Sequence, residues 1–248
     1  MRRAGIEVVA APCQPFSRQR RGRATEDPRS YLLLEFLRFV EALRPDFIFC
    51  ENVPEARNWE GTSGSPGRDL LEALHCLNYA YRHGIVDCRD YGVPQRRARW
   101  VLTASRRGKI GWPHLTHGPG RARPWSTVSD WIGAMPPLVA GQIDAQDPIH
   151  RSANLSPRNL ARIRATPVGG SRLDWPRELL LSYHTQDTSS FSDVYGRLRL
   201  GEPATAMTTR CISLSNGRFG HPTQDRAISA RGGSLADIPS KLPVLWNS

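Results

Sequence analysis

Residues 31–55 read YLLLEFLRFVEALRPDFIFCENVPE, and the order of elements in this stretch decides the fold. Its first half has apolar residues spaced as on one face of a helix: Leu33, Phe36, Leu37 and Val40. Pro45 ends that helix, because proline cannot continue one. An apolar run over residues 47–50 then predicts a buried strand that ends at Glu51.

Similar elements flank this helix and strand. An apolar run over residues 6–11, ended by Pro12, predicts an earlier strand. Apolar runs at residues 85–88 and 100–104 predict later ones. A second helix is predicted by leucines on one face: Leu70, Leu71, Leu74 and Leu77.

Strands that alternate with helices at this spacing imply a mainly parallel α/β sheet. In such sheets the functional groups lie at the carboxyl ends of the strands. Cys13 and Glu51 both fall at predicted strand ends, so we expect them to be functional candidates.

The composition indicates a polyanionic partner. The 248 residues include 34 Lys+Arg and 23 Asp+Glu, which gives a net charge of +11. Nucleic acid is the usual partner of such a chain, and a solvated basic surface is the alternative. No apolar run approaches the ~20 residues of a membrane span, so no membrane partner is expected. Five cysteines without a CxxC pair favour neither a disulfide framework nor a metal site, and they indicate the cytoplasm.

Cys13 lies between two prolines, directly after the first predicted strand. Nearby positive charge raises the thiolate fraction of a cysteine, and four arginines follow closely: Arg18, Arg20, Arg21 and Arg23. These arginines could also hold phosphates. Taken alone, Cys13 is a candidate nucleophile, and a small buried apolar residue is the alternative.

Polar side chains follow the second predicted strand. Glu51 and Asn52 come directly after it, and Pro54 prevents a simple continuation. A carboxylic acid at such a position can be held protonated and donate a hydrogen bond, and a turn cap is the alternative.

Gln95, Arg97 and Arg99 alternate along the chain, so an extended segment would direct them to one side. Guanidinium groups in this arrangement suit phosphate contacts or buried ion pairs. A solvated strand face is the alternative.

Three motifs follow in order: PCQ at residues 12–14, ENV at 51–53 and QxRxR at 95–99. As an ordered set they resemble the DNA (cytosine-5-)-methyltransferase family. The resemblance continues through GWPHLTHGPG, SDVYGRLRLGEPATAMTTR and NGRFGHPTQDRAIS, and extends from Ile6 to Ser229. It implies an α/β fold, with part of a Rossmann-like S-adenosylmethionine-dependent methyltransferase sheet plus a small irregular target-recognition domain.

The resemblance also implies a mechanism. Cys13 would attack carbon 6 of a cytosine flipped out of the duplex. Glu51 would protonate or hydrogen-bond ring nitrogen 3, and carbon 5 would take the methyl group of S-adenosyl-L-methionine. Loss of the proton on carbon 5 would then release the enzyme. Asn52 would help to orient this loop, and Arg97 and Arg99 would complete the catalytic set.

Double-stranded DNA is the partner that the resemblance implies, and residues 17–29 would close over it. The implied DNA-binding residues are Gln14, Ser17, Arg18, Arg20, Arg21, Gln95, Thr208, Thr209 and Arg210. For the last three residues, ordinary strand pairing is an equal alternative.

Three domains are expected. Residues 1–105 would carry the three motifs, residues 106–203 would recognise the target, and residues 204–248 would return to the catalytic domain. The second of these lacks clear periodicity, and its expected anchors are tryptophans: Trp112, Trp125, Trp131 and Trp175.

The chain departs from the family at the donor site. It contains no Phe-x-Gly-x-Gly loop, so Pro12 is the only donor contact implied. Gly232 and Gly233 would also weaken the helix expected near the end, by about 1 kcal/mol each relative to alanine. We expect a truncated chain or one half of a split enzyme, whose partner would be a separately encoded N-terminal half.

Two alternatives without catalysis remain, an inactive DNA-binding remnant and a DNA-binding regulator. A zinc-dependent cytosine deaminase is excluded, because Phe16 stands where a Pro-Cys-x-x-Cys motif needs cysteine and no His-x-Glu occurs. The expected location is the cytoplasm of a bacterial-type cell, in association with the nucleoid.

Overall fold

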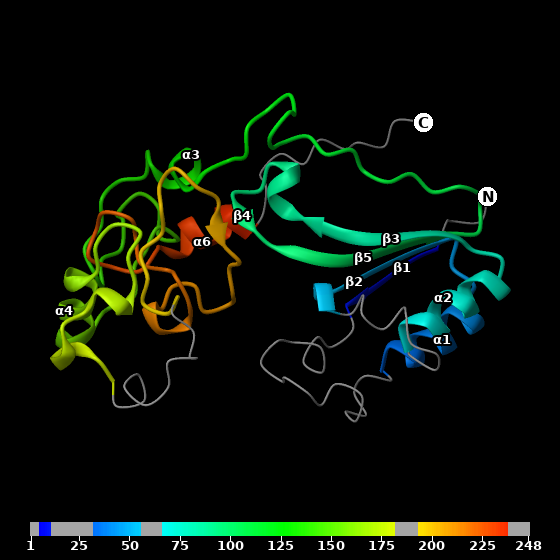
Figure 1. The fold of residues 1–248 in the computed structure, drawn as a ribbon, viewed down its shortest axis with the longest axis horizontal. Helices are drawn as coiled ribbons and strands as arrows, with labels where there is room; N and C mark the ends of the chain where they lie inside the picture. Colours follow the sequence, from blue (N-terminus) through cyan, green and yellow to red (C-terminus); the bar gives the residue numbers. More distant parts are fainter. Residues whose placement is uncertain (1–4, 11–31, 56–65, 182–192, 238–248) are drawn as a thin grey trace. The chain divides into compact units, whose positions relative to one another are not determined.

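The structure is a computed structural model, and it describes residues 5–10, 32–55, 66–181 and 193–237. The chain packs into two compact units, shown in Figure 1. Unit 1 comprises residues 1–87 and 98–114, and unit 2 comprises residues 88–97 and 115–248. No helix within the described ranges is long and apolar enough to cross a membrane.

Unit 1 is built on a four-stranded sheet. Its strands, in spatial order, are β1 (Ile6–Ala10), β2 (Phe47–Asn52), β5 (Ala98–Ser105) and β3 (Ala80–Asp87). β1 is parallel to β2, whereas β5 is antiparallel to both β2 and β3. β1, β2 and β3 therefore run in one direction, and the predicted mainly parallel sheet is wrong at β5.

The length of the connection explains the direction of β5. Only residues 88–97 join β3 to β5. A parallel crossover needs about a dozen residues or more, usually including a helix. β5 therefore pairs antiparallel with β3, from Ala80 opposite Ser105 to Asp87 opposite Ala98.

Two helices cover one face of this sheet (Figure 1). They are α1 (Leu32–Leu43) and α2 (Pro66–Cys76). Phe36 and Val40 of α1 and Leu70 and Leu74 of α2 are buried, as their helical spacing predicted. They pack with residues from the sheet and from the turn before β3: Ile48, Cys50, Tyr79, Trp100, Leu102 and Ala104.

Unit 2 has little regular structure. Its helices are α3 (Val128–Ile132), α4 (Pro157–Ala165) and α6 (Ala230–Asp237). A two-residue parallel pair joins β4 (Gln95–Arg96) to β6 (Ala204–Thr205). Four single turns of 3₁₀ helix complete the described elements: η4 (Cys88–Tyr91), η5 (Arg172–Asp174), η6 (Arg177–Leu179) and η7 (Leu214–Asn216).

Two apolar clusters hold unit 2 together. One contains Val128, Ile132, Leu198, Ala204, Met207, Phe219 and Ile228. The other contains Ile163, Trp175, Tyr195, Leu214 and Ala227. Each cluster joins residues from before and after position 204, so in the structure these two parts of the chain share cores. The three-domain division stays a prediction about function.

The expected tryptophan anchors belong to both units. Trp175 lies in a core cluster of unit 2, and Trp131 packs partly against the other. The Trp125 indole N–H donates to Asp90 Oδ1 at 2.9 Å. Trp112 instead belongs to unit 1, where its ring lies beside Gly84.

The glycines near the end of the chain do not prevent a helix. Both lie within α6, and their expected cost in helix propensity stays a prediction. A Cβ atom on Gly233 would lie 2.6 Å from Cys211 Sγ, and one on Gly232 would lie 3.4 Å from Ile132 Cγ2. The missing side chains therefore allow α6 to pack closely on its neighbours, and this packing offsets the low helix propensity.

We expect Leu70→Ala to lower the free energy of unfolding by about 3 kcal/mol, because it leaves a cavity between α2 and the sheet. Urea unfolding of the chain measures this change. Leu43→Ala is the matched control, since Leu43 is exposed, and it should change stability by less than about 0.5 kcal/mol. Equal effects of the two substitutions would contradict this account of the core.

Candidate functional site

The carboxyl ends of β1 and β2 lie side by side. In their parallel pairing Ala10 is opposite Glu51, the penultimate residue of β2. Cys13 follows Ala10 by three positions and lies outside the described residues. β1 therefore ends at the edge of the sheet where the ENV motif lies.

Glu51 is held by an arginine from the neighbouring strand. Arg99 Nε lies 2.6 Å from Glu51 Oε1, and Arg99 Nη1 donates to the Ala98 carbonyl at 2.7 Å. Glu51 is opposite Val101 in the β2–β5 pairing, so Arg99 is its diagonal neighbour on the same face. Both side chains are partly exposed. The pair fixes the position of the carboxyl group and leaves it accessible.

Asn52 points to the other face of the sheet and is buried. Its Oδ1 accepts a hydrogen bond from the Val53 amide at 2.8 Å. Its buried Nδ2 has no hydrogen-bond partner among the residues that the structure describes. An unpaired buried donor is unfavourable, so the Asn52 amide can donate one more hydrogen bond at this strand end.

The cysteine next to Glu51 is unsuited to nucleophilic attack. Cys50 is fully buried, and burial, together with the nearby charge of Glu51, raises the pKa of its thiol to about 12. A thiol of that pKa does not ionise near neutral pH. Position 50 therefore does not compete with Cys13 for the role of nucleophile.

Gln95 and Arg97 both bind the backbone of Met207. Gln95 is buried, and its Oε1 accepts from the Met207 amide at 2.8 Å. Arg97 Nη1 donates to the Met207 carbonyl at 3.2 Å. Two members of the QxRxR motif therefore fix the Met207 backbone in unit 2, and these two bonds are here called the Met207 brace. The third member, Arg99, binds Glu51 in unit 1.

This brace precedes three candidate DNA-binding residues. Thr208, Thr209 and Arg210 follow Met207 directly, and all three are exposed. They lie after β6, outside any described strand, so the alternative of strand pairing is wrong for them. Anchoring of Met207 fixes the point from which they project.

The remaining candidates lie outside the described residues. They are Pro12, Gln14, Ser17, Arg18, Arg20 and Arg21.

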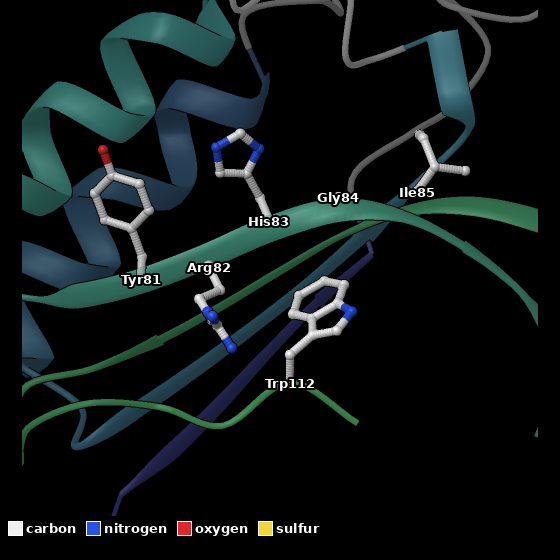
Figure 2. Close-up of a pocket in the computed structure, with 6 residues that line it drawn as sticks. All are labelled: Tyr81, Arg82, His83, Gly84, Ile85 and Trp112. Atoms are coloured by element: carbon white, nitrogen blue, oxygen red, sulfur yellow. The ribbon is translucent and has the colours of Figure 1, made fainter. Parts of the chain in front are cut away.

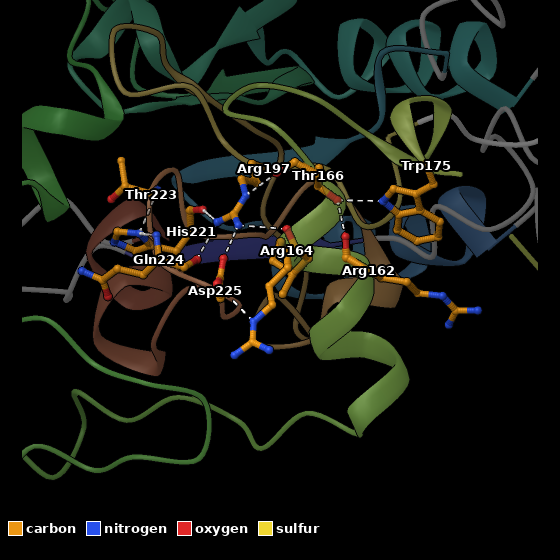
Figure 3. Close-up of polar contacts among 10 residues, drawn as sticks. Arg162, Arg164, Thr166, Trp175, Arg197, His221, Thr223, Gln224 and Asp225 are labelled. Carbon is orange, nitrogen blue, oxygen red and sulfur yellow. Dashed lines mark hydrogen bonds and ion pairs between the residues drawn. The ribbon is translucent and has the colours of Figure 1, made fainter. Parts of the chain in front are cut away.

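A buried arginine, Arg197, organises the centre of unit 2 (Figure 3). Its guanidinium group donates to backbone carbonyls of Thr166, Ile163, His221 and Gln224 at 2.6–2.9 Å. Its charge is paired with Asp225 at 2.5 Å. One side chain thus fixes two loops and the end of α4. Sequence reasoning missed this role, because spacing along the chain does not show which arginines are buried.

His221 lies against the same loops (Figure 3) and is buried. Its Nδ1 accepts from the amides of Thr223 and Gln224 at 3.3 and 3.1 Å, which requires the neutral ring. Burial, and then the charges of Arg226 and Arg197, lower the pKa of His221 to about 3. The histidine therefore serves as a hydrogen-bond acceptor for the loop.

A hollow beside the edge strand β3 lies elsewhere in unit 1 (Figure 2). Tyr81 and His83 lie on one side of the strand, and Arg82 and Trp112 lie on the other. The hollow is lined by Tyr81, Arg82, His83, Gly84, Ile85 and Trp112. None of these is a candidate site residue.

Comparison with known proteins identifies the family. The family model of the C-5 cytosine-specific DNA methylases matches residues 6–231. The chain belongs to this family. The motif resemblance is therefore confirmed, and the methylase motifs PCQ, ENV and QxRxR all lie within the matched range.

Two curated methylases illustrate the relation. The Type II methylase M.HgiDII of Herpetosiphon aurantiacus is 39% identical over 231 residues, which cover 93% of this chain and 64% of that protein. The Type II methyltransferase M1.HphI of Haemophilus parahaemolyticus is 30% identical over 233 residues, covering 93% of this chain and 58% of that one. The chain thus spans about three fifths of the length of these relatives.

A solved structure supports the fold. The crystal structure of a protein described as a DNA modification methyltransferase encoded within an E. coli prophage matches 94% of this chain and 67% of that one. The TM-score is 0.59 and the sequence identity is 17%. The α/β, Rossmann-like fold class predicted from the sequence is confirmed.

We expect acid to destabilise the chain partly through His221. The unfolded histidine binds a proton below about pH 6.5, whereas the folded one does not until about pH 3, so stability falls as the pH falls between these values. In His221→Asn the amide Oδ1 can accept the same bonds without titrating.

Between pH 7 and pH 5 wild type should lose about 2 kcal/mol more unfolding free energy than His221→Asn. Urea unfolding at the two pH values measures the difference. Equal losses in the two proteins would show that His221 is protonated in the folded state at pH 5.

Proposed function

We propose that this chain carries the nucleophile and the target-recognition part of a DNA cytosine carbon-5 methyltransferase. The observation that carries the proposal is the edge of the sheet where the ENV glutamate is held by Arg99, beside the strand that leads to the PCQ cysteine. Family membership supports the same chemistry.

In this proposal the chain activates the cytosine. The Cys13 thiolate adds to carbon 6 of a flipped cytosine, while Glu51 donates a hydrogen bond or proton to ring nitrogen 3. Carbon 5 thereby becomes nucleophilic. After methyl transfer, loss of the carbon-5 proton and cleavage of the sulfur–carbon bond regenerate the thiolate. Arg99 positions Glu51, and Asn52, with its unused donor, orients the loop at this edge.

The brace around Met207 has a defined place in this proposal. Gln95 and Arg97 hold the backbone from which Thr208, Thr209 and Arg210 reach double-stranded DNA. Residues 106–203 recognise the target sequence, and residues 204–248 return to the catalytic part. Gln14, Ser17, Arg18, Arg20 and Arg21 contact the DNA around the flipped base.

S-adenosyl-L-methionine supplies the methyl group in this family, and in our proposal this chain contributes only part of the site for it. The sequence has no Phe-x-Gly-x-Gly loop, and Pro12 alone would contact the donor. We propose that a donor-binding segment outside these 248 residues completes the enzyme, on the same polypeptide or on a separately encoded one. The cytoplasm, at the nucleoid, is the proposed location, and Type II modification is the proposed role.

We expect Cys13→Ala to abolish covalent trapping on DNA that contains 5-fluorocytosine, because fluorine at carbon 5 blocks the release step. The chain is tested together with a donor-binding segment and S-adenosylmethionine, and the adduct is detected by denaturing electrophoresis. Cys76→Ala is the control, because Cys76 is exposed on α2, and it should trap as wild type does.

Two results would contradict this assignment. Trapping by Cys13→Ala would show that another group is the nucleophile. Sequence-selective DNA binding by a folded wild type that never traps would favour an inactive DNA-binding remnant.

We expect Arg20→Ala and Arg21→Ala each to weaken DNA binding across all sequences. Each change should also reduce the slope of log K against log salt by about 0.9, the value for one lost phosphate contact. Fluorescence anisotropy over a range of salt concentrations measures the slope. Arg38→Ala is the control, since Arg38 is an exposed α1 residue paired with Glu35. An unchanged slope would exclude phosphate contacts by these arginines.

A further inference from the structure

Residues 167–174, here called the 167–174 loop, expose two large apolar side chains. Val168 is 64% exposed and Leu173 is 72% exposed. Single exposed apolar residues are common on protein surfaces. Two such side chains on one short loop make this loop a candidate contact surface.

The backbone of this loop is fixed from inside unit 2. The Arg197 amide donates to the Gly170 carbonyl at 3.1 Å. Arg218 Nη1 donates to the carbonyls of Gly169 and Gly170, each at 2.8 Å. The Ser171 amide binds Asp174 Oδ2 at 2.8 Å, and the Leu173 amide binds Ser171 Oγ at 3.2 Å. The exposed side chains therefore project from a preorganised frame, which lowers the entropic cost of binding.

Two glycines make this frame possible. Gly169 has a φ of +70°, a conformation that favours glycine. A Cβ atom on Gly170 would lie 2.6 Å from Pro167 Cγ and 2.7 Å from Asp174 Oδ2. The Gly169–Gly170 pair thus fits the turn that places Val168 and Leu173 outward.

Exposed cations flank the loop. The Arg199 side chain packs directly against Gly169 and is 56% exposed. Arg164, at the end of the helix that leads into the loop, is also exposed. Their partners, Glu202 and Asp225, are at 3.2 and 3.5 Å on the exposed surface. An exposed pair such as Arg199–Glu202 contributes little, so phosphate can replace Glu202 at Arg199. Asp225 stays in place, because it also pairs with the buried Arg197.

Other exposed apolar side chains of unit 2 include Val139, Ile143 and Ile149. In the turn between Ile143 and Ile149, Asp147 pairs with Arg231 at 2.6 Å, and Ile143 bridges to the exposed Arg151. The case for a polyanion at the 167–174 loop therefore rests on Arg199, which packs against that loop.

We propose that the 167–174 loop reads base edges in the major groove of double-stranded DNA, with Val168 and Leu173 contacting thymine methyl groups. The methyl group of thymine is the apolar feature of that groove, and alkyl side chains recognise it. Arg199 contacts an adjacent phosphate. The inference rests on the proposed function and names the residues that set its target sequence.

The test compares the DNA motifs that the 248-residue wild type and its variants select from a random duplex library. Each thymine of the selected motif is then replaced by deoxyuridine, which removes only the methyl group. We expect wild type to bind the deoxyuridine duplex about 3- to 5-fold more weakly at one position or more, the effect of one buried methyl.

Leu173→Ser or Val168→Ser should remove that difference and relax the selected motif at the same position. Val139→Ser is the matched control, because Val139 is 69% exposed and lies outside the 167–174 loop, and it should keep the wild-type motif.

The contrary outcomes are distinct. If both loop variants select the wild-type motif and still discriminate thymine from deoxyuridine, the loop does not read bases. A wild-type motif without a position sensitive to the methyl group also overturns the proposal. If a folded wild type does not bind duplex DNA at all, the proposed function fails together with the inference.

Discussion

The position of β5 between β2 and β3 is the constraint on which unit 1 depends. Because β5 pairs with both neighbours, Arg99 becomes the diagonal neighbour of Glu51 and Trp100 enters the core under α1 and α2. The same pairing sends residues 88–97 out of the sheet and into unit 2. The three residues of the QxRxR motif are thereby divided: Arg99 fixes the candidate acid, and Gln95 and Arg97 fix Met207.

Unit 2 is stabilised by a different means. It contains few regular elements, so many of its backbone carbonyls need donors from outside a helix or sheet. Buried and partly buried arginines supply them, because one guanidinium group carries five N–H donors. Arg197 binds four carbonyls, Arg226 binds those of Leu138 and Ala227, and Arg218 binds three more. Part of the arginine excess is therefore internal structure, although composition alone assigned it to a polyanionic partner.

The sequence predicted those features that depend on neighbours along the chain. Periodicity located β1, β2 and α2, and the strand ends located Glu51. Apolar runs alone did not give the direction of β5. The short connection of residues 88–97 nevertheless favoured antiparallel pairing. The Glu51–Arg99 pair, the Met207 brace and the Arg197 contacts join residues distant in sequence. No local pattern encodes them, so only the structure could show them.

A side chain held on a core strand and a side chain held on a loop differ in how freely they can be substituted. Glu51 projects from a strand whose register also sets the core, so a shift there would turn apolar side chains to the wrong face. Val168 and Leu173 project from a loop whose contacts are made through backbone carbonyls of Gly169 and Gly170. Since those contacts do not involve the two exposed side chains, either can be replaced without loss of the frame. In our proposals chemistry belongs to the strand ends and recognition to the arginine-held loop, so the two could change independently and one catalytic arrangement could serve many target sequences.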